Sequence, residues 1–105
     1  MKRFEVRFLA AAVADLDKLF SHIARESSME TADRYLDRLE HFCLSLSTLP
    51  ARETIVPGRV PGLRRIGFEH RATILFRVGE DKVEILRILY GGRDLTPVLE
   101  EILTR

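Results

Sequence analysis

Residues 63–90 read LRRIGFEHRATILFRVGEDKVEILRILY, and this stretch decides the fold. It holds three runs rich in β-branched and aromatic residues, a composition typical of β-strands. The runs span residues 63–68, 70–78 and 82–90. Gly79-Glu80-Asp81 predicts a tight hairpin turn between the last two runs, and Glu69 with His70 predicts a turn after the first. The stretch therefore predicts a three-stranded antiparallel meander.

The residues before this stretch predict a strand followed by a helix. Phe4, Val6 and Phe8 alternate with charged residues, which is the period of a half-buried strand over residues 3–9. The next apolar residues recur at intervals of three and four positions, which predicts a helix over residues 11–25. They are Leu16, Leu19, Phe20 and Ile23.

A second helix is predicted over residues 29–48. Ser27 and Ser28 break the first pattern and offer a helix cap, and Pro50 ends the second helix because proline cannot donate to the helical ladder. Its apolar residues again recur at three and four, and Arg34 and Arg38 fall on the opposite face with several carboxylates. A loop of about three residues makes the two helices an antiparallel hairpin.

The remaining segments complete one small domain. Residues 51–62 contain two prolines and two glycines, which predicts a loop that returns the chain to the sheet. Residues 95–105 predict a short C-terminal helix with Pro97 in its first turn. The expected fold class is α+β, a single domain over residues 1–105 in which the helix hairpin covers one face of a small sheet.

Composition excludes several classes of protein. The chain is 46% hydrophobic and 31% charged, with a formal net charge of +1, which is far from the basic footprint of a dedicated DNA-binding domain. No run approaches the roughly 20 apolar residues of a membrane span. The lone Cys43 excludes an internal disulfide, favours a reduced cytoplasmic setting and fits a small core side chain.

Few residues offer site chemistry. The three histidines are far apart and there is no Cys-x-x-Cys pair, so we expect no metal and no cofactor. Gly91-Gly92 follows a strand and is either an anion-binding nest or a tight exit from that strand. We assign no catalytic residue.

Arginine is the most informative residue type in the sheet half. By strict strand alternation Arg87 shares a face with Val83, Ile85 and Leu89, so it is either a structural ion pair or a functional group. Four others lie near turns and strand ends, where they either cluster in a groove for an anionic partner or form a solvated basic surface. They are Arg64, Arg65, Arg71 and Arg93.

Five motifs in order resemble the RelE/ParE superfamily of bacterial toxins, and the ParE branch more closely. The first is AVADL at residues 12–16, which is similar to the start of the first helix of ParE-type toxins. Ala32 with Leu49-Pro50 resembles the second helix and its end. The others are PGLR at 61–64, HRATILFRV at 70–78 and ILRILYGGRDL at 85–95.

The resemblance implies the toxin of a type II toxin–antitoxin module. ParE-like members inhibit DNA gyrase, are not enzymes and are neutralised by a ParD-like antitoxin, so that DNA is contacted only through the antitoxin complex. RelE-like members cleave messenger RNA on the ribosome with basic residues and a tyrosine in the tail. Here Leu99 stands at that position, and no tyrosine follows Tyr90. The resemblance therefore favours a gyrase inhibitor.

Two alternatives stay open. A RelE-type endonuclease would use Arg64, Arg65, Arg71 and Arg93 to stabilise phosphate charge. An inactive member would survive as a binding module. The resemblance also implies that the antitoxin wraps the helix hairpin and the sheet edge. Its candidate contacts are surplus apolar residues that also fit the core: Leu19, Phe20, Tyr35 and Phe42.

Overall fold

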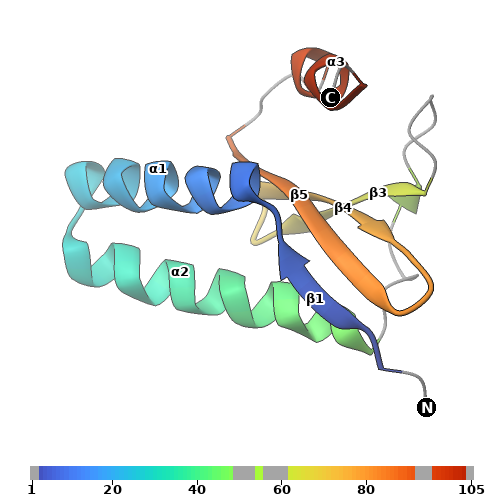
Figure 1. Cartoon of the computed structure of the whole chain (residues 1–105). Coiled ribbons are helices and arrows are strands. Elements are labelled where there is room, and N and C mark those ends of the chain that lie inside the picture. Colours follow the sequence, from blue (N-terminus) through green and yellow to red (C-terminus); the bar gives the residue numbers. More distant parts are fainter. Residues whose placement is uncertain (1–2, 49–53, 56–61, 92–95, 104–105) are drawn as a thin grey trace.

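The computed structural model describes residues 3–48, 54–55, 62–91 and 96–103 (Figure 1). The elements follow one another as a strand, a helix pair, four strands and a last helix. They are β1 (Glu5–Phe8), α1 (Ala10–Glu26), α2 (Met29–Leu44), the 3-10 turn η1 (Ser45–Ser47), β2 (Thr54–Ile55), β3 (Leu63–Phe68), β4 (Ala72–Val78), β5 (Lys82–Tyr90) and α3 (Thr96–Leu103). This order confirms the predicted α+β fold.

The described strands form one sheet in the order β1-β5-β4-β3-β2. The meander β3–β4–β5 is antiparallel as predicted, and β1 lies beside β5 in parallel, with Val6 opposite Val83. The short strand β2 pairs with β3, Thr54 opposite Arg65. The prediction that residues 51–62 are all loop is thus wrong for Thr54 and Ile55, because two ladder positions are too few to leave a hydrophobic period in the sequence.

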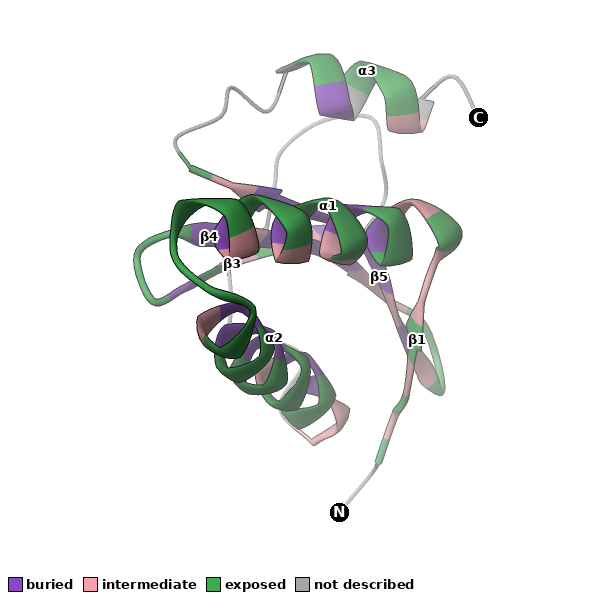
Figure 2. Cartoon of the chain, turned by 90° about the vertical axis from the view of Figure 1, so that its left-hand side faces the viewer, coloured by how far each residue is buried: buried purple, intermediate pink, exposed green. Residues whose placement is uncertain are grey.

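The helix hairpin covers one face of the sheet. Ser28 caps α2, since its Oγ accepts a hydrogen bond from the backbone N–H of Thr31 at 3.0 Å. The apolar stripes of α1 and α2 pack on the inner residues of β4 and β5, and this contact forms the main core (Figure 2). Leu39 of α2 and Phe76 of β4 are fully buried in it.

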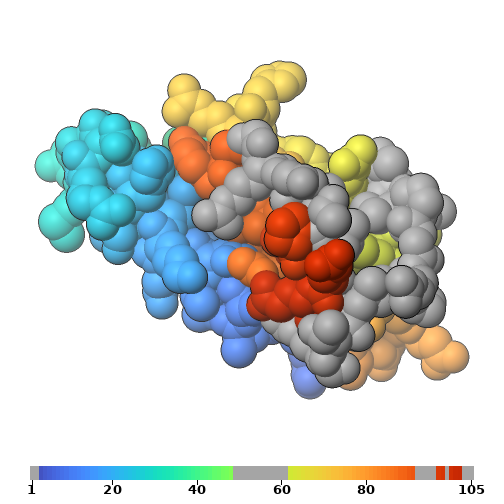
Figure 3. Space-filling model, turned by 90° about the horizontal axis from the view of Figure 1, so that it is seen from above, coloured from blue at the N-terminus to red at the C-terminus, as the bar shows by residue number. Residues whose placement is uncertain are grey.

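The second face of the sheet is covered by α3. Val98 and Ile102 pack on leucines of β3, β4 and β5, and form a smaller core on the side of the sheet away from α2. Those leucines are Leu63, Leu75, Leu86 and Leu89. Figure 3 shows this face, with α3 lying at the surface above the strands. Among the side chains of α3 that the structure describes, Val98 is buried and Ile102 is partly exposed.

A β-bulge in β5 overturns the strict alternation predicted for that strand. Leu75 lies opposite Arg87 and Phe76 opposite Ile85, so Leu86 is an extra residue in β5. One extra residue shifts the phase of every side chain after it. Ile88 therefore joins Ile85 in the main core, while Leu86 lies in the smaller one.

Candidate functional site

Three hollows in the surface meet at Tyr90, the last residue of β5. One, of about 440 Å³, lies between α1 and the end of β5 and is lined by Asp15 and His22. The second, of about 310 Å³, lies between α2 and the turn from β3 to β4. The third, of about 480 Å³, adjoins that turn and is lined by His70 and Arg71. The end of β5 is therefore shared by all three hollows.

The turn between β3 and β4 brings Arg71 to this place. Glu69 and His70 adopt left-handed backbone conformations, with φ of 51° and 58°, which allow a two-residue reversal. The backbone N–H of Gly91 donates to the carbonyl of Arg71 at 2.8 Å, and this bond ties the turn to the end of β5. A side-chain hydrogen bond with Tyr90 raises the pKa of Arg71, so its guanidinium stays charged.

An ion pair joins the same turn to α2. Nε and Nη2 of Arg38 donate to the two carboxylate oxygens of Glu69 at 2.8 and 3.0 Å. The guanidinium carbon of Arg38 also lies 5.4 Å from the centre of the Tyr35 ring. The hydrogen bond from Arg38 lowers the pKa of Glu69, which therefore remains an anion. The sequence missed this pair because its members are 31 residues apart.

Tyr35 lies beneath these charged groups. It is 6% exposed. Its ring packs edge to face on the rings of Phe68 and Tyr90, with distances between ring centres of 5.7 and 6.0 Å. Burial, and then the nearby Tyr90 and Glu69, raise the pKa of Tyr35 to about 12. The hydroxyl oxygen is buried and has no hydrogen-bond partner among the residues that the structure describes. A buried hydroxyl without a partner is uncommon and costly.

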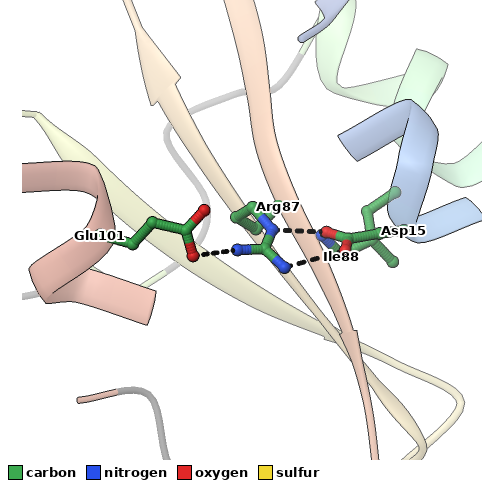
Figure 4. A network of polar contacts seen from close by, with 4 residues as sticks. All are labelled: Asp15, Arg87, Ile88 and Glu101. Carbon is green, nitrogen blue, oxygen red and sulfur yellow. Dashed lines mark hydrogen bonds and ion pairs between the residues drawn. The ribbon is translucent and has the colours of Figure 1, made fainter. Parts of the chain in front are cut away.

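Arg87 forms a structural ion pair, one of its two predicted alternatives (Figure 4). Its Nε and Nη2 donate to the carboxylate of Asp15 in α1 at 2.7 and 2.9 Å, and its Nη1 donates to Glu101 in α3 at 3.0 Å. The backbone N–H of Ile88 also donates to Asp15, at 2.8 Å. The Arg87 and Asp15 side chains are only 11% and 7% exposed. This network fastens both helices to β5.

The structure separates the arginines that the sequence grouped as candidates for toxin activity. Arg64 and Arg65 lie near the start of β3, opposite Phe76 and Leu75, and strand alternation sends them to opposite faces of the sheet. Arg71 follows the far end of that strand, roughly 10 Å of strand away at about 3.3 Å per residue. Arg93 lies outside the described residues. Of the three described arginines, Arg71 lines the hollows at Tyr90 and Arg64 and Arg65 do not.

The four candidate antitoxin contacts divide into two pairs. Leu19 and Tyr35 are buried in the main core, at 4% and 6% exposure. Phe20 and Phe42 are partly exposed and pack on the edge of the same core, where the Phe42 ring lies 5.1 Å from that of Phe68. In the isolated chain, the second pair presents more surface to a partner.

The described residues contain neither a metal-binding cluster nor a membrane-spanning helix. No three histidine, cysteine or acidic side chains in these residues come together in a way that could hold a metal ion. Within the same ranges, no helix has both the length and the apolar character to cross a bilayer. Cys43 is fully buried in the main core, and burial raises the pKa of its thiol to about 12.

Comparisons with known proteins agree with this fold. No curated protein sequence matches the chain significantly. The solved structure of the chromosomal ParDE toxin–antitoxin system from Pseudomonas aeruginosa superposes with a TM-score of 0.74 and 24% identity, over 85% of this chain and 97% of that one. The RelBE2 toxin–antitoxin complex from Mycobacterium tuberculosis gives 0.69 and 24%, over 89% and 97%. A conserved hypothetical protein from Helicobacter pylori gives 0.52 and 15%, over 83% and 93%.

At these identities the solved structures establish the fold. The sequence itself matches a family model over residues 6–95, which includes both helices of the hairpin and the described strands except Glu5 of β1. That model describes the ParE toxin of the type II toxin–antitoxin system parDE. The chain therefore belongs to the ParE family and is the toxin of a type II toxin–antitoxin system.

Proposed function

We propose that this toxin acts in the cytoplasm by inhibiting DNA gyrase, and that a ParD-like antitoxin neutralises it. The observation that carries the proposal is the match to the ParE family model over residues 6–95. Gyrase inhibition is the activity that the resemblance to ParE-type toxins implies. The neighbouring structure from P. aeruginosa is itself a ParDE system, which supports an antitoxin of the ParD kind.

The surroundings of Arg71 favour a toxin that is not an enzyme. Cleavage of RNA at a phosphate needs a group that removes the proton of the attacking 2′-hydroxyl. Glu69 is held by two hydrogen bonds from Arg38, which lower its pKa and make it a weak base. The hydroxyl of Tyr35, beneath these groups, is buried with a pKa of about 12. Neither group suits proton removal near neutral pH.

One observation favours the second candidate, cleavage of messenger RNA on the ribosome. His70, Arg71 and Tyr90 line a single hollow of about 480 Å³, which offers an imidazole beside a cation. An imidazole is the side chain best matched to general-base chemistry at neutral pH. The separation of Arg64 and Arg65 from Arg71 argues against this candidate, because the cations of the proposed RNA site do not converge.

The purified toxin, freed of its antitoxin, tests the two functions side by side. One assay measures DNA supercoiling by gyrase, and the other maps message ends by primer extension in a translation extract. We expect supercoiling to fall, or cleaved complexes to accumulate, while messages stay intact. The variant R71Q tests the contribution of Arg71 in both assays. Its matched control is R77Q, which removes an equal charge at the other end of β4. Codon-specific message cuts with normal supercoiling would favour the endonuclease, and inactivity in both assays would indicate an inactive binding module.

A further inference from the structure

The hollow between α2 and the turn from β3 to β4 has an excess of positive charge. Three arginines and one carboxylate line it, together with the chain's two tyrosines. These residues are Arg34, Tyr35, Arg38, Glu69, Arg71 and Tyr90. Residues of α2 line the hollow on one side, and residues at the ends of β3 and β5 line it on the other.

Much of the hydrogen-bonding capacity of this hollow is unused. Arg38 is engaged by Glu69 and by the carbonyl of Arg34, but no hydrogen bond or ion pair engages the guanidinium of Arg34 within the described part of the chain. Among the described residues, Arg71 interacts most strongly with Tyr90, and a guanidinium has five N–H donors, more than one hydroxyl can engage. The two arginines are exposed, so they can turn toward a ligand.

The buried Tyr35 hydroxyl is a second, independent observation. It has no partner among the described residues, although Tyr90, Glu69, Arg71 and Arg38 all lie near enough to act on it electrostatically. Its pKa of about 12 keeps it protonated, so it can donate a hydrogen bond. Tyr35 lines the hollow beside Arg38 and Arg71, whose side chains are exposed. Within the described residues, the Tyr35 hydroxyl therefore lacks an acceptor.

We propose that this hollow receives one carboxylate side chain, glutamate or aspartate, from a protein partner. Arg71 and Arg34 bind its oxygens, and the Tyr35 hydroxyl donates to it from below. The hydrogen bonds are charge-assisted, and the planar guanidinium suits a carboxylate. The inference rests on the proposed function in one respect, since the antitoxin is the protein expected to supply this side chain.

The charges around the hollow favour an acidic side chain over a nucleic acid. The exposed face of α2 carries four carboxylates, those of Glu30, Asp33, Asp37 and Glu40. These outnumber the two arginines of the same helix that reach the hollow. A nucleic acid laid across α2 would bring many phosphates against these groups, whereas one carboxylate at the end of a side chain would meet only the arginines.

The two tyrosines make a direct test possible. Protein labelled with carbon-13 at Cζ of tyrosine gives two signals in an NMR spectrum, one from Tyr35 and one from Tyr90, and both residues line the hollow. The full chain is titrated with N-acetylglutamate N-methylamide and, as a neutral control, with the glutamine analogue. A short single-stranded RNA is the third probe. The variants are Y35F, which keeps the ring, R71Q, and R77Q at the far end of β4.

We expect the acid probe to shift the tyrosine signals saturably and the glutamine analogue to leave them in place. Binding should weaken about tenfold in R71Q, as loss of a charged hydrogen bond predicts, while R77Q binds like the parent protein. In Y35F the remaining Tyr90 signal should report weaker binding. Equal responses to both analogues, equal losses in R71Q and R77Q, or saturation by RNA alone would each overturn the proposal. Gyrase assays on the same variants measure a different activity, so carboxylate binding in the hollow and gyrase inhibition can each fail without the other.

Discussion

The two faces of the sheet are covered in different ways, and we expect the two covers to contribute unequally to the stability of the fold. On one face, the strands are covered by α1, of 17 residues, and α2, of 16 residues, and the main core lies between them and the sheet. On the other, α3 contributes 8 residues, of which Val98 and Ile102 pack on four leucines. Because hydrophobic stabilisation scales with the apolar area removed from water, we expect the hairpin face to dominate the free energy of unfolding.

Arg87 connects the two faces. It lies in β5 between Asp15 of α1 and Glu101 of α3, and the carboxylates approach it from opposite sides (Figure 4). The contact to α1 is buried and bidentate, while Glu101 is 55% exposed. The two faces thus differ in their polar contacts as well, since the buried ion pair with Asp15 is on the hairpin side and the exposed one with Glu101 is on the α3 side.

The largest expected effect comes from a matched pair of leucines. Leu39 and Leu89 are both almost fully buried, at 0% and 1% exposure, the first under the hairpin and the second under α3. We expect Leu39→Ala to lower the free energy of unfolding by about 4 kcal/mol and Leu89→Ala by about 2 kcal/mol, because a short helix can settle into the cavity. Urea denaturation measures both. Equal losses would contradict the proposed inequality of the two faces.

The buried ion pair should come next. Asp15→Asn leaves Arg87 with one exposed carboxylate and weakens the acceptor for the N–H of Ile88, so we expect a loss of about 3 kcal/mol. Glu101→Gln is the control on the α3 side and should cost at most about 1 kcal/mol, since its side chain is largely in water. Denaturation of D15N, E101Q and the double variant checks this. A larger loss in E101Q than in D15N would reverse the assignment.

The sequence predicted most of the fold because its signals are local. Alternation in Phe4–Phe8 and three-and-four spacing in Leu16–Ile23 require only neighbouring residues. The turn predicted at Glu69 and His70 is also local, and both residues have positive φ in the structure. The bulge at Leu86 left no such signal, because an extra residue in a strand apolar on both faces keeps the run apolar. The two-residue strand β2 was missed for want of length.

The candidate site was less predictable than the fold. Arg71 is one of the candidates that the sequence offers, and the structure places it at the hollows. For its neighbours, the sequence predicts a solvated helix face for Arg38 and a turn for Glu69, and it does not predict their ion pair. Their pairing depends on where the turn from β3 to β4 meets α2, which is a tertiary fact. Tyr35 matched the apolar spacing of its helix, and that pattern could not show that its hydroxyl is buried without a partner.

Alkaline pH should probe the hairpin face through Cys43. Burial raises the pKa of its thiol to about 12 in the folded protein, against about 8.5 in an unfolded chain. Between these values the unfolded chain releases the proton and the folded chain retains it, so stability falls as pH rises. The component contributed by this thiol should reach about 2 kcal/mol at about pH 10. It should be absent in Cys43→Ala.

Chemical denaturation at a series of pH values measures this difference. The two proteins will differ in absolute stability because the substitution removes a buried sulfur, so the slope against pH is the relevant quantity. Tyr35 titrates in both proteins and therefore cancels from the comparison. Parallel curves between about pH 8 and pH 10 would show that the thiol reaches water without unfolding, and that the hairpin face is looser than its burial indicates.

The smallest expected effect is confined to α3. Val98→Ala removes two methyl groups from the smaller core, which we expect to weaken the docking of the helix by about 1.5 kcal/mol. If α3 opens locally while the sheet stays folded, its amide hydrogens should exchange about tenfold faster, and the slowest amides of β4 and β5 should be unaffected. Val83→Ala is the matched control, because Val83 is fully buried on the hairpin face. That substitution should accelerate exchange of the slowest sheet amides. If Val98→Ala did the same, α3 would unfold only together with the sheet, and the two faces would form one cooperative unit.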